Sequence, residues 1–297
     1  MTRRCAGVGL VLLWALLSGF GPGNGFRERF RAAVRADRPA AAEKILKEWE
    51  KAAPRDPDLY VAQFNRLLQK AERVLVQPGP AKSDGLDFKD KNGQTVGNLT
   101  SGYDPELVKQ AAAALNKGLG FAPDRLDMHF GLAKLYEMTG QPELQLRVLR
   151  AALAAHPPTG QPWRWRDGGA LPAPEAQFVP GSLEDYASFY WRQDGDAALE
   201  HGRAVADLIE QYYPKSSLGP FNVGMYHAFK KQSVSAYAKL QQADALTPND
   251  PSTLGNLTRL ALDLKRKDEA AHYLAQLRKL PDSKQAADAF AKELQKL

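Results

Sequence analysis

Apolar residues recur at helical spacing along most of this chain, in paired segments separated by short breaks. The clearest pair lies between Pro123 and Pro157. Its apolar positions are Leu126, Phe130, Leu132, Ala133 and Tyr136 in the first segment and Leu146, Leu149, Ala152 and Leu153 in the second. Gly140 interrupts the pattern, and Pro142 suits the first turn of a new helix, where no backbone donor is needed. The pattern predicts two amphipathic helices joined by a tight turn.

The same reasoning extends to most of the chain. Helices are predicted over residues 26–36, 40–53, 58–75, 104–119, 182–193 and 197–213, with further helical patterns over 214–248 and 251–281. A last helix is predicted at 283–297, and its polar side suits the end of a helical array. Pro123 and Pro157 lie 34 positions apart, and so do Pro214 and Pro248. A repeat of that length predicts stacked helix pairs rather than one globular core.

Two stretches break this period. Residues 77–103 are rich in glycine, aspartate and lysine, and Asn92-Gly93 within them is the strongest short signal for a hairpin turn. Residues 158–181 are dominated by proline, glycine and alanine, so no helix is predicted there. Long irregular segments inside compact domains are usually functional or disordered, and Trp163 and Trp165, on either side of Arg164, argue against simple disorder.

The first 25 residues have the order of a secretory signal peptide. Arg3 and Arg4 precede an apolar run over residues 6–20, and Gly23 and Gly25 suit the positions before a cleavage site. This predicts cleavage after Gly25 and export to the periplasm or the outside of a bacterium of the Gram-negative type. An uncleaved N-terminal anchor is the alternative, although 15 apolar residues are few for a membrane span. Cys5, the one cysteine, lies in this segment, so the mature chain would contain no thiol.

Composition and charge exclude several classes of function. The chain has 297 residues, of which 44% are hydrophobic and 25% charged, as in ordinary globular proteins. The formal net charge of +6 falls to about +4 without Arg3 and Arg4, and basic and acidic residues alternate without long runs. A mixed soluble surface is therefore predicted, and no nucleic-acid partner.

No catalytic or metal site is predicted. The five histidines have none of the spacings of a metal site, and no cofactor is expected. His227 is interpreted as a packing residue, and Asp194-Gly195-Asp196 as a turn, because the later ligands of a calcium loop are missing. The sequence has neither a GxSxG motif nor a phosphate-binding glycine loop.

The spacing of small and large residues resembles that of tetratricopeptide-repeat proteins. The matching positions are Leu132-Ala133, Tyr136, Gly140, Ala152 and Pro157 in one unit, Val223-Gly224, Ala236, Ala243 and Pro248 in another, and Leu257, Ala270 and Leu274 in the last. The resemblance covers residues 26–297 apart from two insertions, at about 77–103 and 158–181. It implies an all-α, right-handed superhelical solenoid of helix pairs, with a small inserted β-hairpin and one long proline- and glycine-rich insertion. Small residues would allow close helix approach.

The resemblance also implies which residues line the inner, concave face of the solenoid. The candidate partner-binding residues on that face are Phe130, Lys134, Phe221, Met225, Phe229 and Arg259. They would form an apolar, aromatic centre flanked by charge, which suits an extended peptide or a helix. The alternative is that Phe221 and Phe229 pack against the neighbouring unit or the insertion. The carboxylate-clamp pattern of chaperone-binding repeats is not matched, because Phe130 and Phe221 stand where lysine would be needed.

The sequence therefore predicts a non-enzymatic scaffold of the cell envelope that binds a protein or peptide. One alternative is a binder of an envelope glycan, with Trp163, Arg164, Trp165 and Trp191 at its ligand site and the tryptophans stacking on sugar rings. A hydrolase with a site between the insertions is a third possibility. Any membrane contact would be through an uncleaved N-terminal segment. A specific function is expected where the two insertions meet the repeat of residues 123–157.

Overall fold

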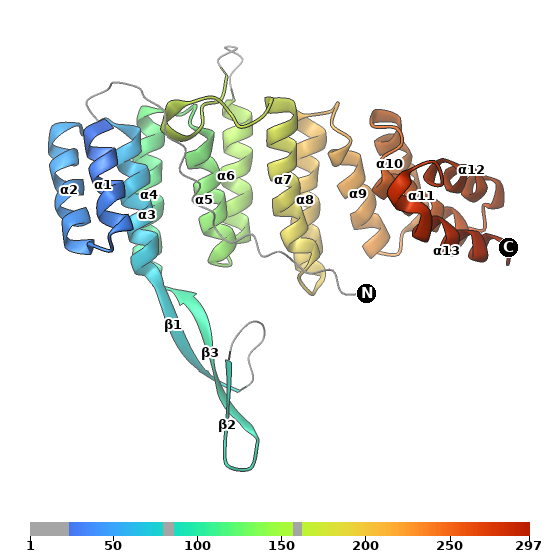
Figure 1. Ribbon diagram of the computed structural model, residues 1–297, viewed down its shortest axis with the longest axis horizontal. Helices are drawn as coiled ribbons and strands as arrows, with labels where there is room; N and C mark the ends of the chain where they lie inside the picture. Colours follow the sequence, from blue (N-terminus) through green and yellow to red (C-terminus); the bar gives the residue numbers. More distant parts are fainter. Residues whose placement is uncertain (1–23, 80–85, 157–161) are drawn as a thin grey trace. The chain divides into compact units, whose positions relative to one another are not determined.

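The computed structural model describes residues 24–79, 86–156 and 162–297. Thirteen α-helices and three β-strands lie in these ranges (Figure 1). The chain divides into two compact units, residues 1–121 and residues 122–297. The all-α expectation with a small inserted sheet is thereby confirmed.

The first unit consists of two helix pairs and the sheet. Its helices are α1 (Asn24–Arg35), α2 (Pro39–Ala52), α3 (Pro57–Ala71) and α4 (Pro105–Phe121). Trp49 and Tyr60 are fully buried between the helices. Asp56 caps α3 by accepting a bond from the Asp58 backbone N–H, and the Trp49 Nε1 donates to its carboxylate at 3.0 Å. The Asp56-Pro57 sequence thus starts α3, because aspartate caps a helix and proline suits its first turn.

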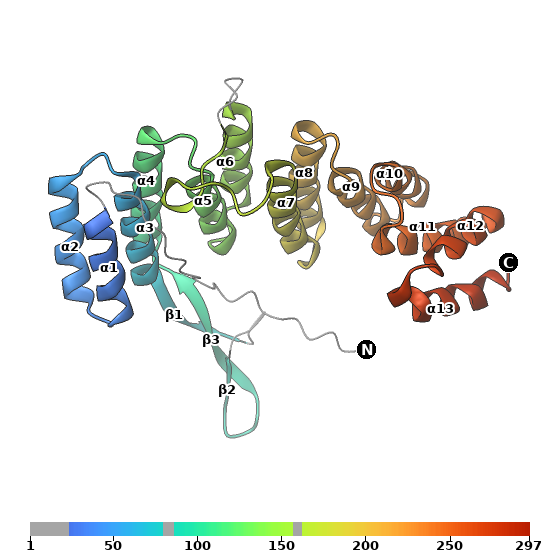
Figure 2. The same cartoon turned by 45° about the horizontal axis from the view of Figure 1, so that its top comes forward.

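A three-stranded antiparallel sheet joins α3 to α4 and projects beyond the ends of these helices (Figures 1 and 2). We call it the arm. Its strands are β1 (Glu72–Pro78), β2 (Leu86–Lys89) and β3 (Thr95–Tyr103), in the order β1-β3-β2. The predicted hairpin is confirmed as β2 and β3, and Gly93 in its turn has a φ of +79°. The third strand, β1, was not predicted.

The predicted helix over residues 58–75 is therefore too long. The α3 helix ends at Ala71, and Leu75 lies in β1, opposite Thr100 of β3. A short apolar run such as Val74-Leu75-Val76 fits a helix or a strand equally well on pattern alone. Pairing with β3 decides for the strand, and the β-branched valines favour that choice.

The second unit is an array of helix pairs. Its helices are α5 (Leu126–Met138), α6 (Pro142–Ala155), α7 (Glu175–Trp191), α8 (Asp196–Tyr212), α9 (Leu218–Phe229), α10 (Ser233–Leu246), α11 (Pro251–Asp263), α12 (Lys267–Leu277) and α13 (Lys284–Leu294). Each helix packs against its pair partner, and α8 contacts α9 while α10 contacts α11. The last helix, α13, packs on α11 and α12, as predicted for a helix that caps the array.

The small residues of the repeat lie where helices approach closely. A Cβ atom on Gly224 of α9 would lie 3.0 Å from Leu240 Cγ and 3.3 Å from the Ala236 carbonyl oxygen of α10. Ala236 and Ala243 are fully buried. The predicted role of these residues in close packing is confirmed.

One boundary in this unit differs from the expectation. The predicted helix over 182–193 begins at Glu175, seven residues earlier, so the irregular insertion ends at Pro174. The Ser182 hydroxyl lies inside the helix and donates to the Phe178 carbonyl oxygen at 2.9 Å. Pro180 hid the helical period in the sequence. The helix tolerates it near the N-terminus because Val179 and Leu183 are fully buried in the core.

Candidate functional site

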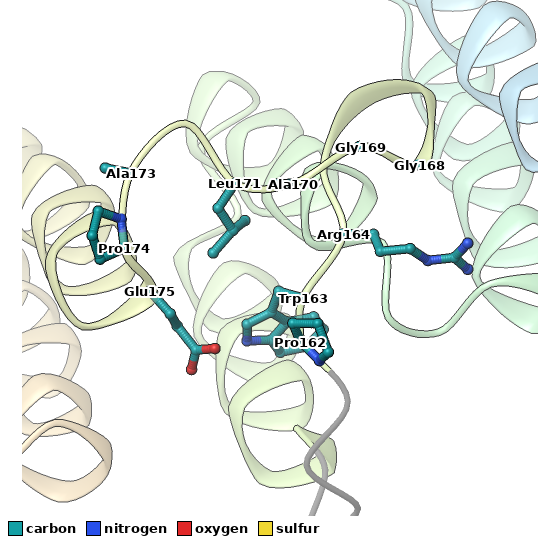
Figure 3. Close-up of a pocket in the computed structure, with 10 residues that line it drawn as sticks. All are labelled: Pro162, Trp163, Arg164, Gly168, Gly169, Ala170, Leu171, Ala173, Pro174 and Glu175. Atoms are coloured by element: carbon teal, nitrogen blue, oxygen red, sulfur yellow. The ribbon is translucent and has the colours of Figure 1, made fainter. Parts of the chain in front are cut away.

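Residues 162–174, here called the strap, run over the helices of the second unit without forming a long helix (Figure 3). Short backbone bonds fix their path. The Arg164 N–H donates to the Asp124 carbonyl oxygen at 2.8 Å, and the Leu126 N–H donates to the Arg164 carbonyl oxygen at 2.9 Å. The Trp165 N–H donates to the Gly169 carbonyl oxygen at 2.7 Å, which closes a tight loop. The strap is therefore paired to the start of α5.

Trp163 attaches the strap to the core. Only 3% of its surface is exposed, and its ring stacks on His156 with centroids 4.2 Å apart and planes 9° apart. His129 of α5 meets the same ring edge-on at 5.7 Å. The Trp163 Nε1 is buried and faces the Tyr213 hydroxyl without the geometry of a hydrogen bond. The indole is thus covered, and no free ring face remains for a sugar.

A carboxylate holds the far side of this cluster. Glu175, at the start of α7, pairs with His156 Nε2 at 2.8 Å and accepts a hydrogen bond from the Tyr213 hydroxyl at 3.1 Å. Burial, and then the charge of Glu175, raise the pKa of Tyr213. The phenol stays protonated and serves as a donor. In Figure 3 the Glu175 and Trp163 side chains point toward the same space.

The other two residues of the Trp-Arg-Trp sequence also serve the fold. Trp165 meets Phe178 edge-on at 4.9 Å and Phe130 at 6.2 Å. Arg164 points away from Trp163 in Figure 3, and its guanidinium makes two bonds to the Asp124 carboxylate, at 2.5 and 2.8 Å. The hydrogen bond and charge of Arg164 lower the pKa of Asp124 against the opposing effect of burial.

A cavity of about 600 Å³ lies beside the strap (Figure 3). Its lining residues are Pro162, Trp163, Arg164, Gly168, Gly169, Ala170, Leu171, Ala173, Pro174 and Glu175. The lining is mainly apolar and open on one side, with Glu175 as its acidic group. All the lining residues belong to the strap and the first residue of α7.

A second candidate surface lies where α7 and α9 meet. The Trp191 Nε1 donates to Asn222 Oδ1 at 3.1 Å, and Asn222 Nδ2 donates to the Leu218 carbonyl oxygen at 2.8 Å and to Glu184 Oε1 at 3.4 Å. Asn222 is only 2% exposed. The amide therefore links two α7 side chains that lie two turns apart on one face.

Phe229 lies at the end of the same surface. Its ring is tilted over Trp191 with centroids 5.8 Å apart, yet 45% of its surface is exposed. Trp191 itself lies close against Gly202 of α8, where an added Cβ would come within 2.7 Å of the ring. Met225, one turn before Phe229, is half-buried. We call Glu184, Trp191, Asn222, Met225 and Phe229 the α7/α9 surface.

Three carboxylates, those of Glu184, Asp185 and Asp250, lie close enough at this surface to affect one another. Burial is the largest cause that raises the pKa of Glu184, and the charges of Asp185 and Asp250 raise it further. The hydrogen bond from Asn222 acts in the opposite direction. A cation near these carboxylates would lower that pKa, because an opposite charge favours the ionised form.

The remaining predicted site residues lie elsewhere. Phe130 is 7% exposed, in the core below the strap, and Lys134 pairs with Glu137. Phe221 packs on the core of α10 to α13, so the packing alternative considered for it describes its position. Arg259 pairs with Glu293 of α13 and lies over the Phe290 ring at 5.0 Å. Of the predicted set, Trp191, Met225 and Phe229 are brought together, and their role in binding stays a prediction.

Sequence reasoning missed Glu184, Asn222, Glu175 and Tyr213 as members of these clusters. Glu184 falls within the predicted helix over residues 182–193 without a further signal. Asn222 lies in an apolar segment, where a buried amide requires a hydrogen-bond partner. That requirement was the one available signal. The two insertions fall in different compact units, the arm in the first and the strap in the second.

Neither metal ligands nor membrane spans stand out in the described ranges. No three histidine, cysteine, aspartate or glutamate side chains there are grouped so that they could hold a metal ion. None of the helices between Asn24 and the C-terminus is long and apolar enough to cross a membrane.

Two of the helix pairs lie within the two 34-residue proline intervals, and α5 and α6 occupy the first. Pro214 and Pro248 bracket α9 and α10, and the small residues of this pair lie at its closest contacts. The chain folds as a series of helix pairs, and their spacing is similar to that of tetratricopeptide repeats. No protein-family model matches the sequence, and no curated protein matches it significantly.

Several solved structures are similar to this repeat protein. TTC0263, a thermophilic TPR protein of Thermus thermophilus, is 21% identical, with 64% of this chain and 92% of that chain covered and a TM-score of 0.38. Pseudomonas aeruginosa PilF is 19% identical over 64% and 83% of the two chains, with a TM-score of 0.37. YrrB, a TPR protein with an unusual peptide-binding site, is 11% identical over 63% and 84%, with a TM-score of 0.39. No residue role or partner transfers to this chain at such scores.

Proposed function

We propose that this protein is a non-catalytic scaffold that binds an apolar segment of another protein at the α7/α9 surface. The observation that carries the proposal is the exposure of Phe229. It is the one exposed phenylalanine, tyrosine or tryptophan among the described residues of the second unit, and its ring lies against Trp191. Aromatic side chains that are fixed in position and partly exposed are the usual anchors of protein interfaces.

The surroundings of Phe229 suit a peptide. Met225 and Trp191 extend the apolar surface along α9 and α7, and methionine adapts to differently shaped apolar partners. Asn222 holds the Trp191 indole in place, so part of the surface is already ordered before a partner binds. Glu184, with Asp185 and Asp250 near it, favours a basic residue beside the apolar anchor of the partner. The proposed partner is therefore an apolar segment with a basic flank.

Selection from a peptide library tests this proposal. Peptides of about 12 residues are selected on the purified protein, and their affinities are measured for the natural protein and for Phe229→Ala. We expect the selected peptides to pair an apolar residue with a nearby lysine or arginine. We expect Phe229→Ala to weaken binding at least tenfold, as loss of an interface anchor does. Leu246→Ala is the matched control, because Leu246 of α10 is also large, apolar and 42% exposed.

The outcomes are distinct. Equal binding by Phe229→Ala and the natural protein would refute the α7/α9 surface as the binding site. Tryptophan fluorescence, titrated with cell-wall glycan fragments, examines the alternative ligand class. A saturable change with glycans and none with the selected peptides would replace the proposal by glycan binding. The covered face of Trp163 argues against that result.

We also propose that the protein acts in the bacterial cell envelope. The support is the order of charged, apolar and small residues over residues 1–25. Expression in a Gram-negative host, with the mass and N-terminal sequence of the periplasmic product, tests it. We expect a chain beginning at Phe26, close to the start of α1 at Asn24. Retention in the cytoplasm would contradict export, and a membrane-bound, uncleaved product would support the anchor.

A further inference from the structure

The arm exposes large apolar side chains that folded proteins usually bury. Val74 and Val76 of β1 are 71% and 74% exposed, and Leu86 of β2 is 71% exposed. The register places Val76, Leu99 and Leu86 side by side across the sheet, on one face. A face of this kind on a projecting element indicates a contact with another molecule.

The outer edge of β1 has unpaired backbone groups. The Asp104 N–H donates to the Ala71 carbonyl oxygen at 2.8 Å, and the register continues from Glu72 opposite Tyr103 to Pro78 opposite Gly97. Because hydrogen-bonded and non-hydrogen-bonded pairs alternate in an antiparallel ladder, the backbone groups of residues 73, 75 and 77 face β3. Those of residues 72, 74 and 76 face outward. Within the described residues, β1 pairs with β3 alone.

The opposite edge of the sheet is protected. The β2 strand has four residues, and charged Asp87 and Lys89 lie along it. The register shifts between Phe88 and Lys89. Short, charged and bulged edges are the usual means of preventing strand addition. The β1 strand has seven residues, and its middle is Val74-Leu75-Val76 without a charge or a proline. Of the two edges, β1 is therefore the one open to a further strand.

We propose that the β1 edge pairs with the β1 edge of a second copy of this chain. The two strands run antiparallel about Leu75, so that Val74 of each copy lies opposite Val76 of the other. Both residues direct their backbone groups outward, and each such pair exchanges both of its N–H···O=C bonds. The two three-stranded sheets become one continuous sheet, which removes both open edges. This interface goes beyond the proposed peptide site.

The charges along β1 are compatible with this register. Arg73 lies opposite the neutral Gln77 of the other copy, and Glu72 lies opposite Pro78. Leu75 meets its own equivalent, and the valines meet valines. No like charges face each other. This matters in a two-fold interface, because each pair of residues away from the axis occurs twice. The Arg73 side chain is already turned toward Asp104 of its own chain.

Oligomeric mass and cross-linking test the pairing. The purified protein is examined by sedimentation velocity over a range of micromolar concentrations. We expect a concentration-dependent dimer, and we expect Val76→Lys to raise its dissociation constant at least tenfold. Val96→Lys is the matched control, because Val96 is a valine of the same arm with 58% exposure that lies away from the β1 edge. Circular dichroism serves to check that each variant keeps its helices.

A single cysteine tests the register. In the proposed pairing Leu75 and its equivalent form a non-hydrogen-bonded pair, with Cα atoms about 4.5 Å apart, which suits a disulfide. Leu75→Cys in a Cys5→Ser background should therefore cross-link on mild oxidation, and Val96→Cys should not. A monomer at every concentration would overturn the proposal. So would a dimer that cross-links through Leu86→Cys rather than Leu75→Cys, since that result means packing face to face. A dimer that Val76→Lys leaves unchanged would also overturn the proposal.

Discussion

The arm and the strap, the two insertions between helices, differ in how regular secondary structure relates to burial. The arm has regular secondary structure, yet Val74, Val76 and Leu86 are more than two-thirds exposed. The strap has almost no regular structure, yet Trp163 is 3% exposed and stacks on His156. Backbone regularity satisfies hydrogen bonds, whereas burial depends on which side chains a segment can place against a core. The strap is thus part of the core of its unit, and the arm is a surface available to other molecules.

The largest difference in the free energy of unfolding is expected when one apolar residue is replaced in each insertion. Trp163→Ala should lower the free energy of unfolding by about 3–5 kcal/mol, because it removes a large buried ring and leaves a cavity beside His156 and His129. Val76→Ala should change it by less than about 0.5 kcal/mol, as exposed substitutions do. Urea unfolding of both variants measures the difference. Equal losses would mean that the strap does not belong to the core.

Two glycine substitutions compare the packed helices of the second unit with the exposed arm, this time by adding volume rather than removing it. Gly202→Ala in α8 places a Cβ 2.7 Å from Trp191 Cζ3, and the packed indole has little room to move. We expect a loss of about 1–3 kcal/mol, the range for overpacking. Gly102→Ala in the arm meets the end of the Leu75 side chain, which is 37% exposed and can rotate. Thermal unfolding should show a lower midpoint temperature for Gly202→Ala. The midpoint of Gly102→Ala should stay close to that of the natural protein.

The Arg164–Asp124 pair shows how much of the strap's attachment is ionic. A double-mutant cycle with Arg164→Ala and Asp124→Asn should give a coupling free energy of about 1 kcal/mol or less, because the arginine side chain is 47% exposed to solvent. The pKa of Asp124 is lowered in the folded protein, so this stabilisation is present above the ordinary carboxyl pKa of 3.8 and is lost as the pH falls below it. A coupling as large at pH 2 as at pH 7 would exclude an ionic origin.

Local signals predicted most of the fold, and long-range contacts explain the failures. Helix pairs follow from the apolar period, and the hairpin follows from Asn92-Gly93. The β1 strand escaped prediction because Val74-Leu75-Val76 fits either structure, and only its pairing with β3 decides.

The candidate site was less accessible to sequence reasoning than the fold. Trp163 and Phe229 are both aromatic residues at positions interpreted as binding residues, yet one is covered and the other exposed. Their exposure differs because of the aromatic ring that each one packs against. His156 covers Trp163 face to face, whereas Trp191 leaves nearly half of Phe229 open. No local pattern encodes either contact.

Mild acid should lower the stability of the second unit but not that of the first. We expect this effect to be the smallest of those considered. Burial lowers the pKa of His129, which contacts Trp163, against smaller opposing effects of the Pro123 carbonyl and Asp127, and burial also lowers that of His201. The unfolded chain therefore takes up protons near pH 6.5 while the folded chain resists, so the stability of the second unit falls as the pH drops through that value.

The first unit, residues 1–121, contains no histidine, so it should not share this response. Amide hydrogen exchange at pH 7.5 and 5.5, corrected for intrinsic rates, should show lost protection in the strap and in α5, with little change in α3, α4 and the arm. His129→Gln keeps a donor for the Pro123 carbonyl oxygen but cannot take up the proton, and should reduce the loss. An unchanged loss in that variant would place the acid response elsewhere, with His201 as the next group to replace.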